Sequence, residues 1–558
     1  MEKEQFEIYL EESKKLIENK EFDNAIEYLN KAIVLKPDSA EVYKLLGNIY
    51  ATNKNLDQSI EYYKKALYID PKYYDVYHNL GSNYAKKNNY DLAIENFNKA
   101  IQINPDKYIA YAKLGEVYEI IEQPDKAIEY YKLSLEINSN DIITNSKLGY
   151  IYFSLKEEYN EALVCFNKLI NINPELQFYT HIGYAYQELG NVELAIKNYE
   201  IAIEKDPKDN LTYANLGIAY KSLNNTQKEI EYLEKAIQLG CKDVSIKNEL
   251  KDIYLKKASN YQNDKLFDKA KEYYHKVLVI YPDNCLSYCN IGYILLTFEE
   301  NYVEALKYFE EVKKLNPEYP QIYSYIGMVY HKTGKYDLAF QNYEKAIELD
   351  QNNLTAYSNL GLLYELQKDY NKAKEYYNKA IIINPNDYLI YYYLGGVYID
   401  EENYDKASNY LEKAKELNPE YSDIYTCMGL INCKVEKYDL AFQNYEKAIE
   451  LDQNNLTAYS NLGLLYELQK DYSKAINYYE KIININPIDI DAYYKLGNIY
   501  KELGKYNKAS EILEEAININ NKIPEIYESL SEICRRQGNL NKAEEYSDKL
   551  NKLKLKEI

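Results

Sequence analysis

Asparagine side chains recur at one place in the sequence, directly before a Leu-Gly or Ile-Gly pair. The five positions are Asn79, Asn215, Asn290, Asn359 and Asn461. An amide both donates and accepts hydrogen bonds, so a row of amides can bind the backbone of an extended peptide without selecting its sequence. We therefore predict that these residues bind a protein or peptide partner. The alternative is that they are solvated surface residues in a chain rich in Asn.

The residue types that usually carry catalysis do not form a constellation. The four histidines are isolated from one another and from cysteine: His78, His181, His275 and His331. Cys285 and Cys289 lie four residues apart, but a metal site needs further ligands and no other Cys or His is close in sequence. The sequence contains no phosphate-binding, dinucleotide-binding or nucleophile-elbow glycine motif. We predict a non-catalytic protein with no metal and no cofactor.

The charge and the apolar pattern exclude several kinds of partner. The formal net charge is −21, and an acidic surface repels phosphate groups, so we expect no nucleic-acid partner. No apolar run approaches the roughly 18 residues that cross a bilayer, so we expect no membrane insertion. The N-terminal residues lack the apolar segment of a secretory signal. The seven scattered cysteines indicate free thiols in a reducing compartment, so we predict a cytoplasmic protein.

A repeat of 34 residues organises the chain and must position these side chains. The segment "YHNLGSNY" (77–84) recurs as "YAKLGEVY" (111–118) and "YANLGIAY" (213–220), and residues 337–370 recur without change 102 residues later. The spacing of Tyr77, Leu80, Gly81 and Tyr84 puts all four on one helical face. A second segment, "DLAIENFNKAIQINP" (91–105), predicts a second helix that ends before a proline. Glycine at position 81 and its equivalents is small enough to let the two helices approach closely.

This pattern resembles the tetratricopeptide repeat (TPR) family, with about sixteen units over nearly the whole chain. The resemblance implies an all-α fold, a right-handed superhelical α-solenoid of helix-turn-helix repeats. It also implies a concave groove lined mainly by the first helix of each repeat. The chain departs from the family in having Tyr, from Tyr9 to Tyr527, where the family often has Trp, with Asn145 as the exception.

The repeat spacing predicts four regions. Residues 6–243 form an array of about seven repeats, 244–250 an extra-length junction that is helical, 251–543 an array of about nine repeats, and 544–558 a C-terminal capping helix. Two repeats contain one additional residue, which we place in the turn between their helices, at 156–163 and 298–306.

The resemblance also implies a specific ligand near the N-terminus. TPR co-chaperones hold the acidic tail of a chaperone with a clamp of Lys, Asn and Arg side chains from three repeats. Lys44, Asn48 and Asn79 match the first three clamp positions. Lys113 stands where the clamp has Arg and keeps the charge, whereas Ile109 stands where the clamp has Lys and removes one cation.

We predict a scaffold or adaptor that binds protein or peptide partners in its groove. Three alternatives remain open: a co-chaperone, a spacer between larger assemblies, and a substrate-recruiting subunit for a separate enzyme such as an O-linked N-acetylglucosamine transferase. The Asn row resembles a sparse form of the asparagine ladder in those transferases. Because Asn359 and Asn461 lie in identical segments, a multivalent ligand is a further prediction.

Overall fold

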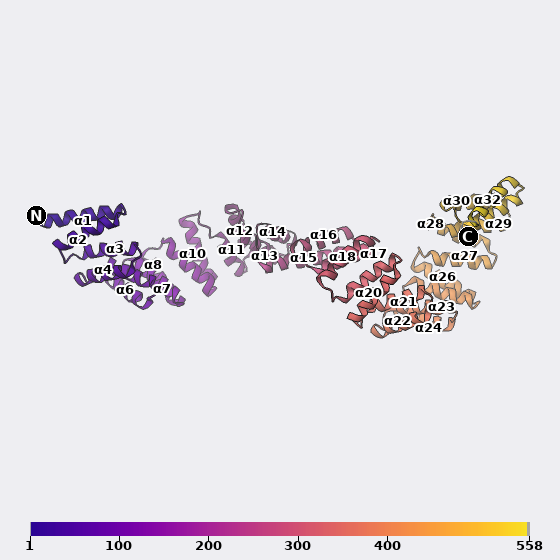
Figure 1. Ribbon diagram of the computed structural model, residues 1–558, viewed down its shortest axis with the longest axis horizontal. Coiled ribbons are helices and arrows are strands. Elements are labelled where there is room, and N and C mark those ends of the chain that lie inside the picture. The colour runs from indigo at the N-terminus through magenta and orange to yellow at the C-terminus, as the bar shows by residue number, and fades with distance from the viewer. Residues whose placement is uncertain (1, 555–558) are drawn as a thin grey trace. The chain divides into compact units, whose positions relative to one another are not determined.

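The computed structural model describes residues 2–554, and within them the predicted all-α array of paired helices is confirmed. Thirty-two α-helices form sixteen successive pairs, with one short π-helix and no β-strand in the described residues. Figure 1 shows the helices following one another along the chain, and neighbours in sequence such as α3 and α4 or α4 and α5 contact each other. The chain divides into two compact units, residues 1–256 and 257–558, and the division falls inside helix α15.

In the first unit, the first helices of the pairs are α1 (Glu2–Glu18), α3 (Ala40–Thr52), α5 (Tyr74–Lys86), α7 (Tyr108–Ile120), α9 (Ile142–Tyr150), α11 (Tyr179–Glu188) and α13 (Asn210–Ser222). The second helices are α2 (Phe22–Leu35), α4 (Leu56–Ile69), α6 (Tyr90–Ile103), α8 (Pro124–Ile137), α10 (Tyr159–Ile172), α12 (Val192–Lys205) and α14 (Thr226–Gln238). The π-helix η1 (Ile151–Lys156) continues α9.

Helix α15 (Val244–Asn263) is the first helix of the eighth pair. The later first helices are α17 (Cys285–Thr297), α19 (Pro320–Lys332), α21 (Leu354–Leu366), α23 (Tyr388–Asp400), α25 (Ser422–Lys434), α27 (Leu456–Leu468), α29 (Ile490–Glu502) and α31 (Pro524–Arg536). The second helices are α16 (Phe267–Ile280), α18 (Tyr302–Leu315), α20 (Tyr336–Leu349), α22 (Tyr370–Ile383), α24 (Tyr404–Leu417), α26 (Tyr438–Leu451), α28 (Tyr472–Ile485), α30 (Tyr506–Ile519) and α32 (Leu540–Lys554).

Close contact between a glycine and a large side chain joins the two helices of most pairs. A Cβ atom added to Gly81 would lie 2.9 Å from the ring of Phe97, and thirteen glycines contact a buried Tyr, Phe or Leu in this way. These glycines therefore serve helix packing, as the sequence predicts. The large partners are almost fully buried and form the core of each pair.

The turn inside each pair contains one residue in the left-handed conformation. Twelve of these sixteen residues are not glycine, for example Lys54 and Lys368, each with φ of 60°. Only Gly190, Gly334 and the equivalent residues 504 and 538 relieve the steric cost that a side chain incurs there. The turn is therefore fixed by the packing of the helices that it joins, not by its own sequence.

Many successive first helices pack directly against one another, as α3, α5 and α7 do in the first unit and as α17, α19 and α21 do in the second. Second helices of successive pairs are spaced more widely. The first helices thus line the more closely spaced side of the array, and we call their shared surface the first-helix face. The side chains that the sequence selects for partner binding all lie on first helices.

Three irregular segments show where extra residues are placed. The extra residue near 156–163 was predicted in a turn, and this is wrong: it is absorbed by η1, because a π-helix takes one more residue per turn. Near 298–306 the extra residue does lie in the turn, between α17 and α18. Residues 244–250 form the start of α15, and 544–554 continue α32, while 555–558 lie outside the described residues.

Candidate partner-binding surface

Two of the predicted binding residues, Asn48 and Asn79, contact each other across successive first helices. The Asn79 amide Nδ2 donates to Oδ1 of Asn48 at 3.0 Å, and the Tyr63 hydroxyl donates to the same oxygen at 2.7 Å. His78 Nδ1 lies 3.3 Å from Asn79 Oδ1. Burial lowers the pKa of His78, so its ring is uncharged at pH 7. The two amides already have partners within the protein, and a ligand would have to share them.

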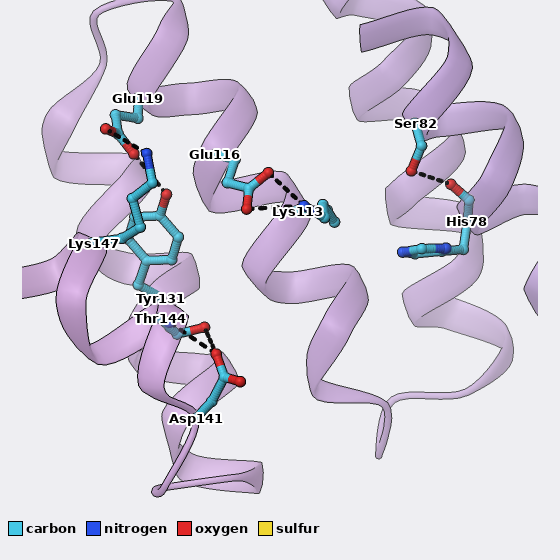
Figure 2. Close-up of polar contacts among 9 residues, drawn as sticks. All are labelled: His78, Ser82, Lys113, Glu116, Glu119, Tyr131, Asp141, Thr144 and Lys147. Carbon is cyan, nitrogen blue, oxygen red and sulfur yellow. Dashed lines mark hydrogen bonds and ion pairs between the residues drawn. The ribbon is translucent and has the colours of Figure 1, made fainter. Parts of the chain in front are cut away.

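The two predicted lysines differ in their surroundings. Lys113 Nζ forms an ion pair with Glu116 of the same helix at 2.7 Å, which Figure 2 shows. Lys44 Nζ lies 5.1 Å from the centre of the Tyr73 ring, and no carboxylate of the described residues pairs with it. Ile109, which stands where the clamp has its other Lys, is 40% exposed. The charge of Lys113 is therefore already balanced, whereas that of Lys44 is open to an anionic ligand.

The remaining asparagines fall into two groups. Asn359 Nδ2 donates to the Thr355 backbone oxygen at 2.8 Å, which leaves its Oδ1 as an acceptor. Asn215 is 9% exposed, and Asn290 and Asn461 are half-buried. None of these three amides has a hydrogen-bond partner in the described residues. Amides with free hydrogen-bonding capacity thus occur in both units.

A carboxylate on the first-helix face, Glu119, was not among the predicted residues. It accepts a hydrogen bond from the Tyr131 hydroxyl at 2.8 Å and pairs with Lys147 at 3.2 Å, as Figure 2 shows. Lys147 follows Glu119 by 28 residues, and the same types recur at that spacing in Glu467 and Lys495. That recurrence is a signal in the sequence that could have identified the pair.

Asparagine side chains also connect successive first helices at their N-termini. Asn455 Nδ2 lies 3.1 Å from Ser422 Oγ and 3.0 Å from Thr426 Oγ1, both on the preceding first helix. The copy of Asn455 in the duplicated segment, Asn353, accepts one hydrogen bond from Ser324 at 3.0 Å. Identical segments therefore have different neighbours, because the helix that precedes each copy differs.

The described residues offer little for covalent or metal chemistry. No group of three or more His, Cys, Asp or Glu residues among them is arranged to hold a metal ion. Burial raises the pKa of Cys289 to about 12 and that of Cys427 to about 11, so both thiols are protonated and unreactive at pH 7. None of the described helices combines the length and the apolar character needed to span a bilayer.

Comparison with protein families gives matches along most of the chain. Four models described as tetratricopeptide repeat and one described as TPR repeat match residues 14–54, 38–106, 73–140, 144–176, 183–224, 212–239, 252–284, 287–319, 318–384, 365–431, 420–488 and 466–533. No curated protein matches the sequence.

Three solved structures are among those that match this chain. The APC/C hetero-tetramer Cut9–Hcn1 matches 88% of this chain and 96% of its own, with 15% identity and a TM-score of 0.42. The Naa15/Naa10 complex bound to HypK-THB matches 98% and 99%, with 14% identity and a TM-score of 0.37. The structure of MamA matches 29% and 94%, with 25% identity and a TM-score of 0.27.

Proposed function

Because the chain belongs to the tetratricopeptide repeat family, we propose that it is a non-catalytic scaffold that binds protein or peptide partners on the first-helix face. The observation that carries this proposal is the free hydrogen-bonding capacity of Asn290 and Asn461. Neither amide is bonded to another group of the described residues, so both are open to a ligand. An extended peptide supplies both donors and acceptors along its backbone, so it is the ligand that these amides fit.

The duplicated segment supports a ligand with more than one contact point. Helices α21 and α27 are identical in sequence and have equivalent bounds, so they present Asn359 and Asn461 on helices of the same type. A ligand that repeats a short motif can engage both, and the second contact then forms at a high effective concentration. We therefore propose a repetitive or bivalent partner.

The experiment is cross-linking of the full-length protein in a lysate, followed by mass spectrometry of the captured partners. We expect cross-links to first helices. Replacing Asn290, Asn359 and Asn461 together with Ala should reduce the captured amount several-fold, since a net hydrogen bond contributes about 1 kcal/mol.

The matched control replaces Asn342 and Asn444, which occupy equivalent positions on the second helices α20 and α26 and bond only to their own helices. This control should capture partners as the wild type does. Equal capture by all three proteins, or cross-links confined to second helices, would exclude the first-helix face as the binding surface.

The co-chaperone alternative rests on Lys44, whose charge is open, and has its own test. Titration of the full chain with an acidic chaperone-tail peptide should give saturable binding that Lys44→Ala abolishes. Lys113→Ala should have a smaller effect, because Glu116 already balances that charge. Absence of binding at low salt would exclude this alternative.

A further inference from the structure

One arrangement occurs three times on first helices: a glutamate accepts a hydrogen bond from a tyrosine of the second helix in the same pair. Tyr131 donates to Glu119 at 2.8 Å. Tyr377 donates to Glu365 at 2.7 Å. The third instance, Tyr479 with Glu467, has a distance of 2.5 Å. In each case the tyrosine fixes one carboxylate oxygen and leaves the other directed to the surroundings.

In two of the three instances, the next first helix supplies a cation. Lys147 pairs with Glu119 at 3.2 Å. Lys495 lies near Glu467 and lowers its pKa, against the larger effect of burial, which raises it. The ion pair of Lys495, at 3.3 Å, is however with Asp491 of its own helix. Each lysine is 28 residues beyond its glutamate. The protein therefore supplies a cation near both carboxylates and forms a direct ion pair with one of them, Glu119.

At Glu365 the cation is missing. The residue 28 positions later is Tyr393, whose ring stacks on Tyr377 at 5.7 Å with an interplanar angle of 20°. No Lys or Arg of the described residues pairs with Glu365, and its only hydrogen-bond partner is Tyr377. Burial raises the pKa of Glu365, and the negative charge of Asp400 raises it further. The carboxylate thus lies half-buried beside a second negative charge, with nothing to balance it.

Space for a cation exists above the same carboxylate. Gly396 lies on the next first helix, α23, three residues after Tyr393 and on the same side of the helix. A Cβ added to Gly396 would meet only Glu365 Oε1, at 4.0 Å. The equivalent residues beside Glu119 and Glu467 are Tyr150 and Asn498, which carry side chains. A glycine in mid-helix disfavours the helix, and packing does not require this one.

We propose that Glu365, Tyr393 and the space over Gly396 form a subsite for a lysine or arginine side chain of a partner peptide. This inference rests on the proposed function, which places the backbone of the partner peptide on the first-helix face. The cation of the ligand replaces the lysine that the protein supplies at Glu119 and Glu467. Its head group pairs with Oε1 of Glu365, and its aliphatic stem passes the face of the Tyr393 ring. The net charge of −21 favours the approach of a basic segment.

The test is selection of random peptides displayed on phage against the full-length protein, followed by affinity measurements on synthetic copies. We expect enriched peptides to share one Lys or Arg, and replacement of that residue by Met to weaken binding about tenfold or more. Glu365→Gln should weaken binding of the basic peptide to the same extent. The matched control is Glu119→Gln, which should change affinity less than about twofold because Lys147 already pairs with that carboxylate.

A second variant supplies the missing cation from the protein itself. Tyr393→Lys recreates the arrangement of Glu119 with Lys147, and it should abolish the preference for basic peptides while the far-ultraviolet circular dichroism stays unchanged. Enriched peptides that lack a basic residue, or that bind wild type and Glu365→Gln equally, would overturn the subsite and leave the scaffold function standing. A selection that enriches no peptide would overturn the peptide-binding function, and the subsite with it.

Discussion

Gly395 lies directly against the side chain of Leu411, so that a Cβ added to the glycine would stand 2.7 Å from Leu411 Cγ. The neighbouring Gly396 has open space instead. We expect Gly395→Ala to destabilise the second unit by roughly 1–3 kcal/mol, because the new methyl group overpacks the contact between α23 and α24. Gly396→Ala should stabilise α23 by up to about 1 kcal/mol, since alanine favours helix formation.

The measurement for these two variants is urea unfolding together with amide hydrogen exchange in α23. Exchange is needed because long repeat arrays do not unfold in a single cooperative step. If the two alanine variants shifted the exchange rates of α23 in the same direction, the distinction between a packing glycine and an open one would be wrong.

A second prediction concerns the left-handed turn residues. Lys368 and Lys470 both have φ of 60° and lie in identical segments. Replacing either with glycine should raise the free energy of unfolding by about 0.5–1 kcal/mol, because glycine has no Cβ to clash in this conformation. The two substitutions should have equal effects. Gly334→Ala, at an equivalent turn with φ of 71°, should lower stability by a similar amount. Urea midpoints check all three.

The third prediction separates helix capping from contacts between helices. Asn353 and Asn455 each accept a hydrogen bond from the backbone at their own helix start, at 3.0 and 2.9 Å. Only Asn455 also donates to Ser422 and Thr426. Asn455→Ala should therefore cost about 1 kcal/mol more than Asn353→Ala, because it removes contacts with two hydroxyl groups of the preceding helix, whereas Asn353→Ala removes the contact with Ser324 alone. Equal losses in thermal or urea unfolding would contradict this assignment.

The fourth prediction follows from the raised pKa of Glu365. Burial disfavours the charged carboxylate in the folded protein, so the folded state binds the proton more tightly than the unfolded state. Stability therefore falls as the pH rises from the ordinary range of a glutamate through the raised pKa of Glu365. Glu365→Gln has no such charge and should be more stable than wild type at pH 7.

The gain from Glu365→Gln should disappear at pH 4, where the wild-type carboxyl is protonated. Glu119→Gln is the comparison, because Lys147 pairs with that carboxylate and its neutral replacement should give no such gain at pH 7. Urea midpoints at both pH values measure the differences. A gain from Glu365→Gln that was the same at pH 4 and pH 7 would show that the charge is not its source.

The period of the sequence predicted the pairing of helices because each repeat contacts mainly its neighbours. Gly81 and Phe97 are only 16 residues apart, so a short-range pattern determines their contact. The turn residues were not predicted, since Lys54 and Lys368 do not favour the left-handed conformation that the packed helices impose on them. Nor did counting residues show that the extra residue near 156–163 enters a π-helix.

The candidate site was predicted less completely, because its contacts join different repeats. Asn48 and Asn79 were each selected for a ligand, yet they bond to each other across 31 residues of sequence. Lys113 was selected for its positive charge. Whether Glu116 pairs with that charge depends on how the two side chains are oriented, which the sequence does not show. The family resemblance identified positions on the first helices. It did not indicate which of these side chains already have hydrogen-bond or ion-pair partners within the protein.

The duplicated block also creates an ambiguity during folding. Helices α20 and α26 have the same sequence, and so do α21 and α27, so α20 can pack on α27 with the contacts that α26 makes there. Such a misassembled chain would loop out three repeats, and the entropy of closing a loop grows only slowly with its length. The helices that precede the two copies distinguish the correct assembly from the misassembled one. Ser422 and Thr426 bond to Asn455, whereas Ser324 bonds to Asn353. These few polar contacts let an array that grew by copying keep its repeats in order.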